Sequence, residues 1–234
     1  MPFIPAAASC GVLRLKIKRR GLYSLLAKSL REQNKSRSRA LKLAQRARIL
    51  NPLGYEERKE LGKVFCDLDE FDYGLEELDN AHSWKPDNPE ILFEMGKNHL
   101  KRALICNDKD LRKKTLNNAM DNIKQALRIL EKSQVEKRGI VRYWLGKVYS
   151  ELNQNKKAIP HFRILFKVRF DKQKIDDAWL IAALQLGCAL FKIKSYDEAE
   201  SIFGQIIKRL GCANNSNADN FEADCNHLFY SNTP

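Results

Sequence analysis

The chain has 234 residues and a formal net charge of +13, and 44% of its residues are hydrophobic, which is enough to bury the core of one or two domains or of one elongated array. Its 11 Gly and 7 Pro are too few for a linker-dominated or fibrous protein. Six scattered Cys without a C-x-x-C pair argue against a disulfide framework or a zinc site. We therefore expect free thiols, no metal and no cofactor in a soluble, intracellular, cytoplasmic protein. The most apolar stretch, residues 179–191, is shorter than the ~20 residues of a spanning helix, so we predict no membrane span.

The basic charge is concentrated at the N-terminus. Residues 1–48 contain 13 Lys and Arg and a single acid, Glu32, which gives this part a net charge of +12. Residues 1–20 are predicted to form a flexible basic arm. Its composition is compatible with a mitochondrial presequence, with an arm that docks on RNA or another anionic surface, or with a soluble cap. The candidate contacts with an anionic surface are Arg14, Lys16, Lys18, Arg19 and Arg20.

A short pattern recurs along the rest of the chain. In residues 61–65, 95–99 and 145–149 an apolar residue, a glycine and a lysine are followed by a ring-bearing residue three positions after the glycine, and residues 186–188 repeat the start without the lysine. Twelve residues after Gly62, Gly146 and Gly187 stands a small residue, and four residues later an apolar one. This spacing places small and apolar side chains on one face of a second helix. The predicted core is the apolar set at these positions: Leu61, Phe65, Leu78, Leu145, Tyr149, Phe162, Leu186 and Phe203.

The pattern resembles the tetratricopeptide repeat, a helical hairpin of ~34 residues with a Leu-Gly-x-x-Tyr first helix, an Ala-x-x-x-Phe-x-x-Ala second helix and a closing proline. Pro52 and Pro86 stand at the proline position of the first two repeats. The resemblance implies an all-α fold, a right-handed α-solenoid of about five hairpins over residues 21–213. The hairpins would be residues 21–54, 55–88, 89–132, 139–172 and 176–213, followed by a polar C-terminal tail at 214–234.

Two intervals exceed the family period: Gly96 to Gly146, which concerns the third hairpin, and Gly146 to Gly187, which are 41 residues apart. Gly62 and Gly96 are 34 residues apart, but Gly96 and Gly146 are 50 apart, and the small residue Ala119 lies 23 residues after its glycine instead of twelve. The eleven added residues amount to about three helical turns. We therefore expect longer helices in the third hairpin and a protruding tip at residues 107–110. We also expect a lengthened link at 133–137 and a loop at 172–176.

The sequence contains no motif for catalysis. The four His form no pair at i+3 or i+4, and no G-x-S-x-G or H-E-x-x-H is present. The Gly-Lys pairs lack the flanking residues of a phosphate-binding loop. His99 occupies the aromatic position of its repeat, so we expect it to pack against its neighbours. We therefore predict a non-catalytic protein with no small-molecule substrate.

In the family that the chain resembles, the first helices of successive repeats line a concave groove. The resemblance implies that the residue after each glycine, and the residue three before it, face this groove. A row formed by Lys63, Lys97 and Lys147 beside aromatic rings would suit an acidic peptide segment. The alternatives are a solvated face, or an ion-pair network completed by Glu94 and Glu151. The candidate groove residues are Lys59, Lys63, Phe93, Lys97, Tyr143 and Lys147.

One specific partner is rejected at this level. Family members that bind the acidic C-terminus of heat-shock chaperones use a clamp of Lys, Asn and Arg. This chain has Glu94, Ile140 and Trp144 at three of the clamp positions, so the clamp is not reproduced.

We predict a non-catalytic scaffold or adaptor for protein–protein interaction, which binds a segment of a protein partner in the groove. The alternative is an RNA- or ribonucleoprotein-associated helical-repeat protein that uses the basic N-terminal region. Import into mitochondria stays open beside a cytoplasmic location.

Overall fold

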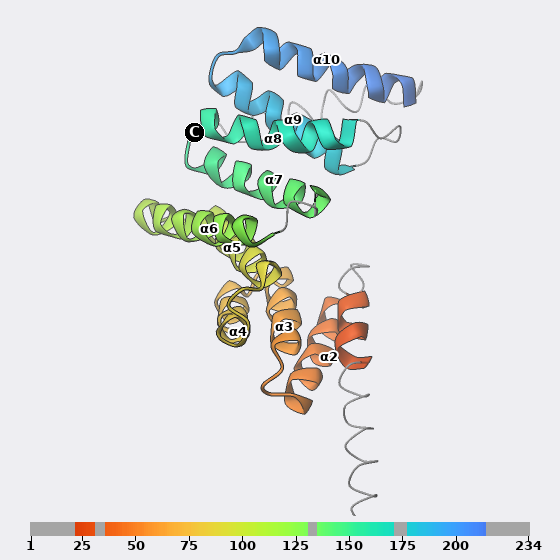
Figure 1. The fold of residues 1–234 in the computed structure, drawn as a ribbon, viewed down its shortest axis with the longest axis vertical. Helices are drawn as coiled ribbons and strands as arrows, with labels where there is room; N and C mark the ends of the chain where they lie inside the picture. The colour runs from red at the N-terminus through yellow and green to blue at the C-terminus, as the bar shows by residue number, and fades with distance from the viewer. Residues whose placement is uncertain (1–21, 31–35, 131–134, 171–176, 214–234) are drawn as a thin grey trace, which may run out of the picture. The chain divides into compact units, whose positions relative to one another are not determined.

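The computed structural model describes residues 22–30, 36–130, 135–170 and 177–213. Every regular element in these ranges is a helix (Figure 1). The predicted basic arm, the loop at 172–176 and the polar tail lie outside the described residues. After a helical segment at residues 22–30 come α2 (Arg37–Leu50), α3 (Tyr55–Asp67), α4 (Phe71–Trp84), α5 (Pro89–Ile105), α6 (Lys109–Ile129), α7 (Val135–Glu151), α8 (Asn155–Phe170), α9 (Asp177–Lys192) and α10 (Tyr196–Ala213).

The chain divides into two compact units, Met1–Trp144 and Leu145–Pro234, and the division falls within α7. In the first unit α3 packs against α2 and α4, and α5 packs against α4 and α6. In the second unit α9 packs against α8 and α10. Helices that are neighbours in sequence are therefore neighbours in space, as in stacked helical hairpins. This confirms the predicted all-α fold built from hairpins.

Three hairpins turn in the same way. The residue seven positions after the repeat glycine has a left-handed backbone conformation: Asp69 (φ 62°), Asn153 (φ 56°) and Lys194 (φ 65°). Its N–H donates to the carbonyl three positions earlier, and the next N–H donates to the carbonyl five positions earlier, at 2.8 to 3.3 Å. This pair of bonds is the Schellman motif, which satisfies carbonyls at a helix end. The shared turn fixes the same register in all three repeats.

The third hairpin has the expected longer helices. Helix α6 has 21 residues and α5 has 17, whereas α3 and α4 of the preceding hairpin have 13 and 14; since α7 also has 17, the extension is clearest in α6. Its turn is also different, because the Asp108 side chain caps α6 by accepting hydrogen bonds from the N–H groups of Asp110 and Leu111. Residues 107–110 at the tip are exposed.

The link to the fourth hairpin is shorter than predicted. Helix α7 begins at Val135, so the last three residues of the expected link at 133–137 are helical. No Gly or Pro stands between Val135 and Lys137 to stop a helix from extending in the N-terminal direction.

Six of the eight predicted core residues are buried: Leu61, Leu78, Leu145, Tyr149, Phe162 and Leu186. Phe65 and Phe203 are only partly buried. Phe65 packs against a buried cluster formed by Ala27, Ala40, Ala44, Leu61 and Val64. The alanines of this cluster come from the helical segment 22–30 and α2, so helices within the predicted first hairpin, residues 21–54, contribute to the core.

The repeat glycines lie where two helices of a hairpin cross closely. A β-carbon built on Gly96 of α5 would lie 2.4 Å from Cγ1 of Ile123 and 3.1 Å from the carbonyl oxygen of Ala119, both in α6. The same β-carbon on Gly146 or Gly187 would lie 2.6 or 2.5 Å from a phenylalanine ring of the second helix. A larger residue would push these helices apart, so the spacing read from the sequence reflects a direct contact.

Candidate functional site

The first helices of three hairpins, α3, α5 and α7, contribute charged and aromatic side chains to one connected cluster in the first unit. We call this cluster the α3–α5–α7 face. Its members are Glu56, Lys59 and Lys63 on α3, Glu90, Phe93, Glu94 and Lys97 on α5, and Tyr143 and Trp144 on α7.

Two lysines of α3 converge on one carboxylate of α5. Lys59 Nζ lies 2.8 Å from Oε2 of Glu90, and Lys63 Nζ lies 2.9 Å from its Oε1. Lys59 also contacts Glu56 at 2.7 Å, and Lys63 approaches Glu94 at 3.9 Å. The two lysine side chains are 7% exposed, whereas those of Glu56 and Glu90 are 50% and 52% exposed. The ammonium groups therefore lie inside this network, and its solvent-facing part is acidic.

The network shifts the pKa values of its members. Burial alone would disfavour the charged form of Glu90, but hydrogen bonds and charges from Lys59 and Lys63 outweigh it and lower the pKa of Glu90 from 4.5 to about 2. Burial likewise opposes the charge of Lys59, and its hydrogen bonds to Glu56 and Glu90 outweigh this and raise its pKa. Glu90 and Lys59 are therefore both charged at neutral pH, and each helps to hold the other in place.

The second part of the face is aromatic. The ammonium of Lys97 lies 5.4 Å from the ring centroids of both Phe93 and Trp144, and 3.0 Å from Oε2 of Glu94. The Trp144 ring meets those of Phe93 and Tyr143 edge to face, at centroid distances of 6.3 and 6.1 Å. Burial raises the pKa of Tyr143 to about 12, so its hydroxyl stays neutral. All three rings are half-buried, which leaves part of their apolar surface open to a ligand.

The structure thus brings together five of the six residues predicted for the groove. Lys59, Lys63, Phe93, Lys97 and Tyr143 belong to the α3–α5–α7 face, and Glu94 pairs with Lys97 as the alternative hypothesis of an ion-pair network requires. Lys147 belongs to the second unit, where it is half-buried and makes interactions of its own. The five predicted basic contacts of the N-terminal arm lie outside the described residues.

Three members of the face were not predicted to belong to it: Glu56, Glu90 and Trp144. Glu90 stands six residues before Gly96, and nothing in its own helix distinguishes it from other first-turn acids. In the sequence, Trp144 stands out only as a residue that breaks the chaperone clamp. A tryptophan that stands next to a tyrosine, two positions before a repeat glycine, is the sequence feature that could have indicated this binding surface, because these two residue types are enriched in protein-binding hot spots.

We also searched the part of the chain that the structure describes for a metal site, a membrane-spanning helix and a reactive thiol. Within it, no group of three or more His, Cys, Asp or Glu side chains could hold a metal ion. None of the described helices is both long and apolar enough to cross a bilayer. Burial raises the pKa of the Cys66 thiol to about 12, so this thiol is unreactive.

Solved structures share this arrangement of helices. The thermophilic TPR protein TTC0263 of Thermus thermophilus is 17% identical, with a TM-score of 0.64 over 81% of this chain and 91% of its own. The MamA protein is 15% identical, with a TM-score of 0.60 over 93% and 98%. The nearly identical TPR-like repeats of a Podosopora anserina protein are 13% identical, with a TM-score of 0.66 over 85% and 98%. No protein-family model and no curated protein matches the sequence.

Proposed function

We propose that this chain, which has the tetratricopeptide-repeat fold, is a non-catalytic scaffold that holds a segment of a partner protein on its α3–α5–α7 face. The observation that carries the proposal is the aromatic cluster of Phe93, Tyr143 and Trp144, which is half-buried and contains an ammonium held between two rings. Tyrosine and tryptophan provide large, rigid contact areas at low entropic cost, and they are enriched where binding energy concentrates.

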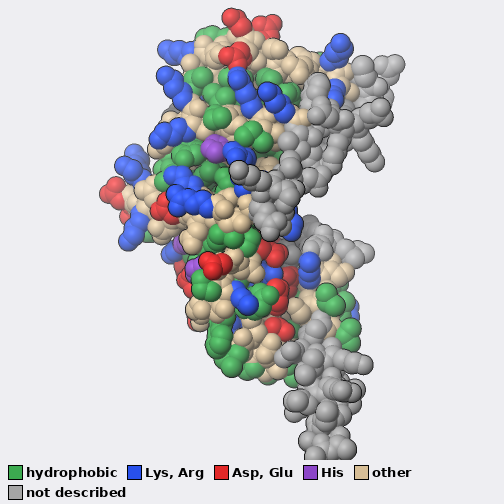
Figure 2. Space-filling model, in the orientation of Figure 1, with side chains coloured by type: hydrophobic (Ala, Val, Ile, Leu, Met, Phe, Trp, Pro, Cys, Tyr) green, Lys and Arg blue, Asp and Glu red, His purple; other side chains and the backbone are tan. Residues whose placement is uncertain are grey.

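The charges of the face favour a partner that is held mainly by the rings. Three lysines (59, 63 and 97) are matched by three carboxylates (Glu56, Glu90 and Glu94), so this network is neutral. Figure 2 shows acidic side chains gathered beside α3. An acidic segment would have to compete with Glu90 for two ammonium groups that are 7% exposed. Lys97, whose side chain is 25% exposed, is the cation of this face best placed to meet an acidic group of a partner.

Preorganisation supports this role. The network of Lys59, Lys63 and Glu90 ties α3 to α5 before any partner arrives, and the Phe93–Trp144 contact ties α5 to α7. A segment that lies on a surface already fixed in its binding geometry loses less free energy to ordering. We therefore expect the rings to contribute most of the affinity and the ion pairs to contribute rigidity.

The test is a peptide library displayed on phage and selected on the full-length protein. Selected peptides are then measured against Trp144→Ala and against Trp84→Ala, whose side chain on α4 is 52% exposed and lies outside the face. Loss of a central aromatic contact is expected to cost ~2 kcal/mol or more, about a thirtyfold loss in affinity. Trp84→Ala should bind as the wild type does.

Two results would count against the proposal. Peptides that bind both tryptophan variants equally well would place the binding surface elsewhere. Binding of RNA that disappears with residues 1–20, in a protein that selects no peptide, would favour the RNA-associated alternative. The acidic-segment hypothesis is tested in the same experiment, because it requires selected peptides rich in Asp and Glu whose binding weakens in Lys97→Gln.

A further inference from the structure

The charges of the α3–α5–α7 face are ordered along α5. Glu90, Glu94 and Lys97 stand at positions i, i+4 and i+7, so they lie on one side of the helix. About 10 Å of helix separates Glu90 from Lys97, because each residue adds about 1.5 Å. Phe93 stands between these two positions, and its ring meets that of Trp144 edge to face. The face therefore has an acidic end, an aromatic middle and a basic end.

The carboxylates are the accessible groups at the acidic end. The side chains of Glu56 and Glu90 are 50% and 52% exposed. The two lysine side chains that pair with them, those of Lys59 and Lys63, are only 7% exposed, so a partner meets the carboxylates first. Oε2 of each glutamate lies within 2.8 Å of the Lys59 ammonium, so the two carboxylates are neighbours. A carboxylate can accept about four hydrogen bonds, so one guanidinium or ammonium of a partner can bind both glutamates.

The basic end is formed by Lys97. Its side chain is 25% exposed, and its ammonium donates to Oε2 of Glu94 at 3.0 Å. An ammonium has three donors, so Lys97 can also donate to a carboxylate that approaches from solvent. The rings of Phe93 and Trp144, 5.4 Å from the ammonium, keep it beside the aromatic middle. A segment that covers these rings therefore brings its neighbouring residues over Lys97.

We propose that the partner segment carries a basic residue and an acidic residue on opposite sides of an apolar or aromatic residue. The basic side chain binds Glu56 and Glu90, the apolar one covers the rings, and the acidic one binds Lys97. The two charges of the segment are about 10 Å apart, which corresponds to about three residues of an extended chain. This inference rests on the proposed function, and it specifies the partner of the same surface.

The same order of charges excludes two simpler partners. A uniformly acidic segment places a carboxylate against Glu56 and Glu90, and a uniformly basic segment places a cation against Lys97. Like charges brought together in this way lower the affinity. The face therefore selects a segment both by the charges that it attracts and by those that it repels.

The test uses the full-length protein and the peptides selected on it by phage display. Peptides whose binding depends on Trp144 should have Arg or Lys on one side of an apolar or aromatic residue, and Asp or Glu on the other. A synthetic copy of the most enriched peptide is compared with copies in which the basic residue, the acidic residue or both are replaced by Gln. Fluorescence anisotropy gives the affinity of each copy for the wild type, for Glu56→Gln and for Lys97→Gln.

Each neutral replacement in the peptide should weaken its binding to the wild type about two- to fivefold, as expected for a half-exposed ion pair. Glu56→Gln should weaken the parent peptide by a similar factor, but it should not affect the copy that lacks the basic residue, because that ion pair is already lost. Lys97→Gln should have the same relation to the acidic residue of the peptide.

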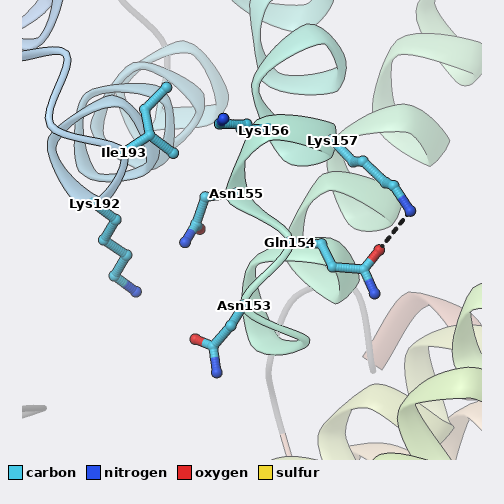
Figure 3. Close-up of a pocket in the computed structure, with 7 residues that line it drawn as sticks. All are labelled: Asn153, Gln154, Asn155, Lys156, Lys157, Lys192 and Ile193. Carbon is cyan, nitrogen blue, oxygen red and sulfur yellow. Dashed lines mark hydrogen bonds between the residues drawn. The ribbon is translucent and has the colours of Figure 1, made fainter.

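Two exposed residues outside the face provide controls with the same change of charge. Glu76→Gln on α4 and Lys192→Gln on α9 should bind every peptide as the wild type does. Lys192 belongs to the second unit, where it lines a pocket of about 450 Å³ together with Asn155 (Figure 3). This pocket lies where α8 begins and α9 ends, and none of its lining residues belongs to the α3–α5–α7 face.

Peptides that depend on Trp144 but carry one kind of charge, or none, would overturn this inference and leave the proposed function standing. Equal weakening of the parent peptide and of the copy without its basic residue by Glu56→Gln would also overturn it, because the carboxylate would then not bind that residue. So would a control variant that weakens binding as much as its counterpart on the face, because the protein would then be sensing only total charge. Peptides that bind independently of Trp144 would contradict the proposed function, and this inference with it.

Discussion

Replacing Gly96 by alanine tests the close crossing of α5 and α6. The added methyl group would lie 2.4 Å from Cγ1 of Ile123, whereas carbon atoms pack best at about 3.5–4.0 Å. Ile123 is fully buried and β-branched, so it has few other rotamers in a helix. The second close contact, 3.1 Å to the carbonyl oxygen of Ala119, involves backbone that moves only if the helices separate.

Two opposing effects set the magnitude. Overpacking a well-filled core costs about 1–3 kcal/mol, and the contacts at Gly96 place this variant toward the upper end. Alanine gains about 1 kcal/mol over glycine in a helix interior. We therefore expect Gly96→Ala to lower the free energy of unfolding by about 1–2 kcal/mol.

The matched control is Gly204→Ala in α10, where nothing lies within 4 Å of the added β-carbon. This change should gain about 0.5–1 kcal/mol from helix propensity alone. Urea unfolding followed by circular dichroism gives the global stabilities. Hydrogen exchange read by mass spectrometry on peptides of α5, α6 and α10 assigns each effect to its own helices. A Gly96→Ala protein that gains stability as Gly204→Ala does would refute the close crossing.

Four further predictions address the ion-pair network, the core and the turns. Glu90→Gln should lose about 1–3 kcal/mol at pH 7, because it leaves two buried ammonium groups without their shared carboxylate. Since the pKa of Glu90 is lowered to about 2, the wild type keeps this contribution above about pH 4.5 and loses it as the pH falls toward 2. The free energies of unfolding of the wild type and Glu90→Gln, measured by urea titration, should therefore converge near pH 2. Glu200→Gln, a change of an exposed residue, is the control, and its stability should run parallel to that of the wild type at every pH. Burial lowers the pKa of His99 from 6.5 to about 4. The neutral ring therefore stabilises the fold above pH 6.5, and this contribution disappears as the pH falls toward 4. In His99→Phe the free energy of unfolding should depend less on pH between 6.5 and 4. Leu145→Ala should lower the free energy of unfolding, measured by chemical denaturation, by about 2–5 kcal/mol, because the leucine is buried. The largest loss of protection from hydrogen exchange should occur in α8 and α9. A free energy of unfolding close to that of the wild type would mean that the site is not tightly packed. Lys194→Gly should raise the thermal midpoint, gaining up to about 1 kcal/mol, because glycine adopts φ 65° without steric cost; a lower midpoint would contradict the left-handed turn.

The recurring pattern was sufficient to predict the helices and most of the core. The spacing of twelve from Gly62 to Gly74 and from Gly146 to Ala158 depends only on the length of a helical hairpin, and such local geometry is repeated in each unit. The eleven added residues after Gly96 predicted longer helices for the same reason. The pattern did not predict where α7 begins, because helix ends depend on capping groups and packing that a repeat period does not encode.

The sequence by itself determined the type of protein: an all-α array of hairpins with a basic N-terminal region and lysines at a repeated position. Only the tertiary structure decided what those lysines do, because Glu90 reaches Lys59 and Lys63 across the gap between two helices and is 27 or more residues away in the chain. The same holds for Asn155, which is an ordinary polar residue in the sequence and lines a pocket only because α9 ends beside α8. Charge pairing and pocket formation depend on which helices meet, and a repeat pattern fixes the helices without fixing which side chains face each other across them.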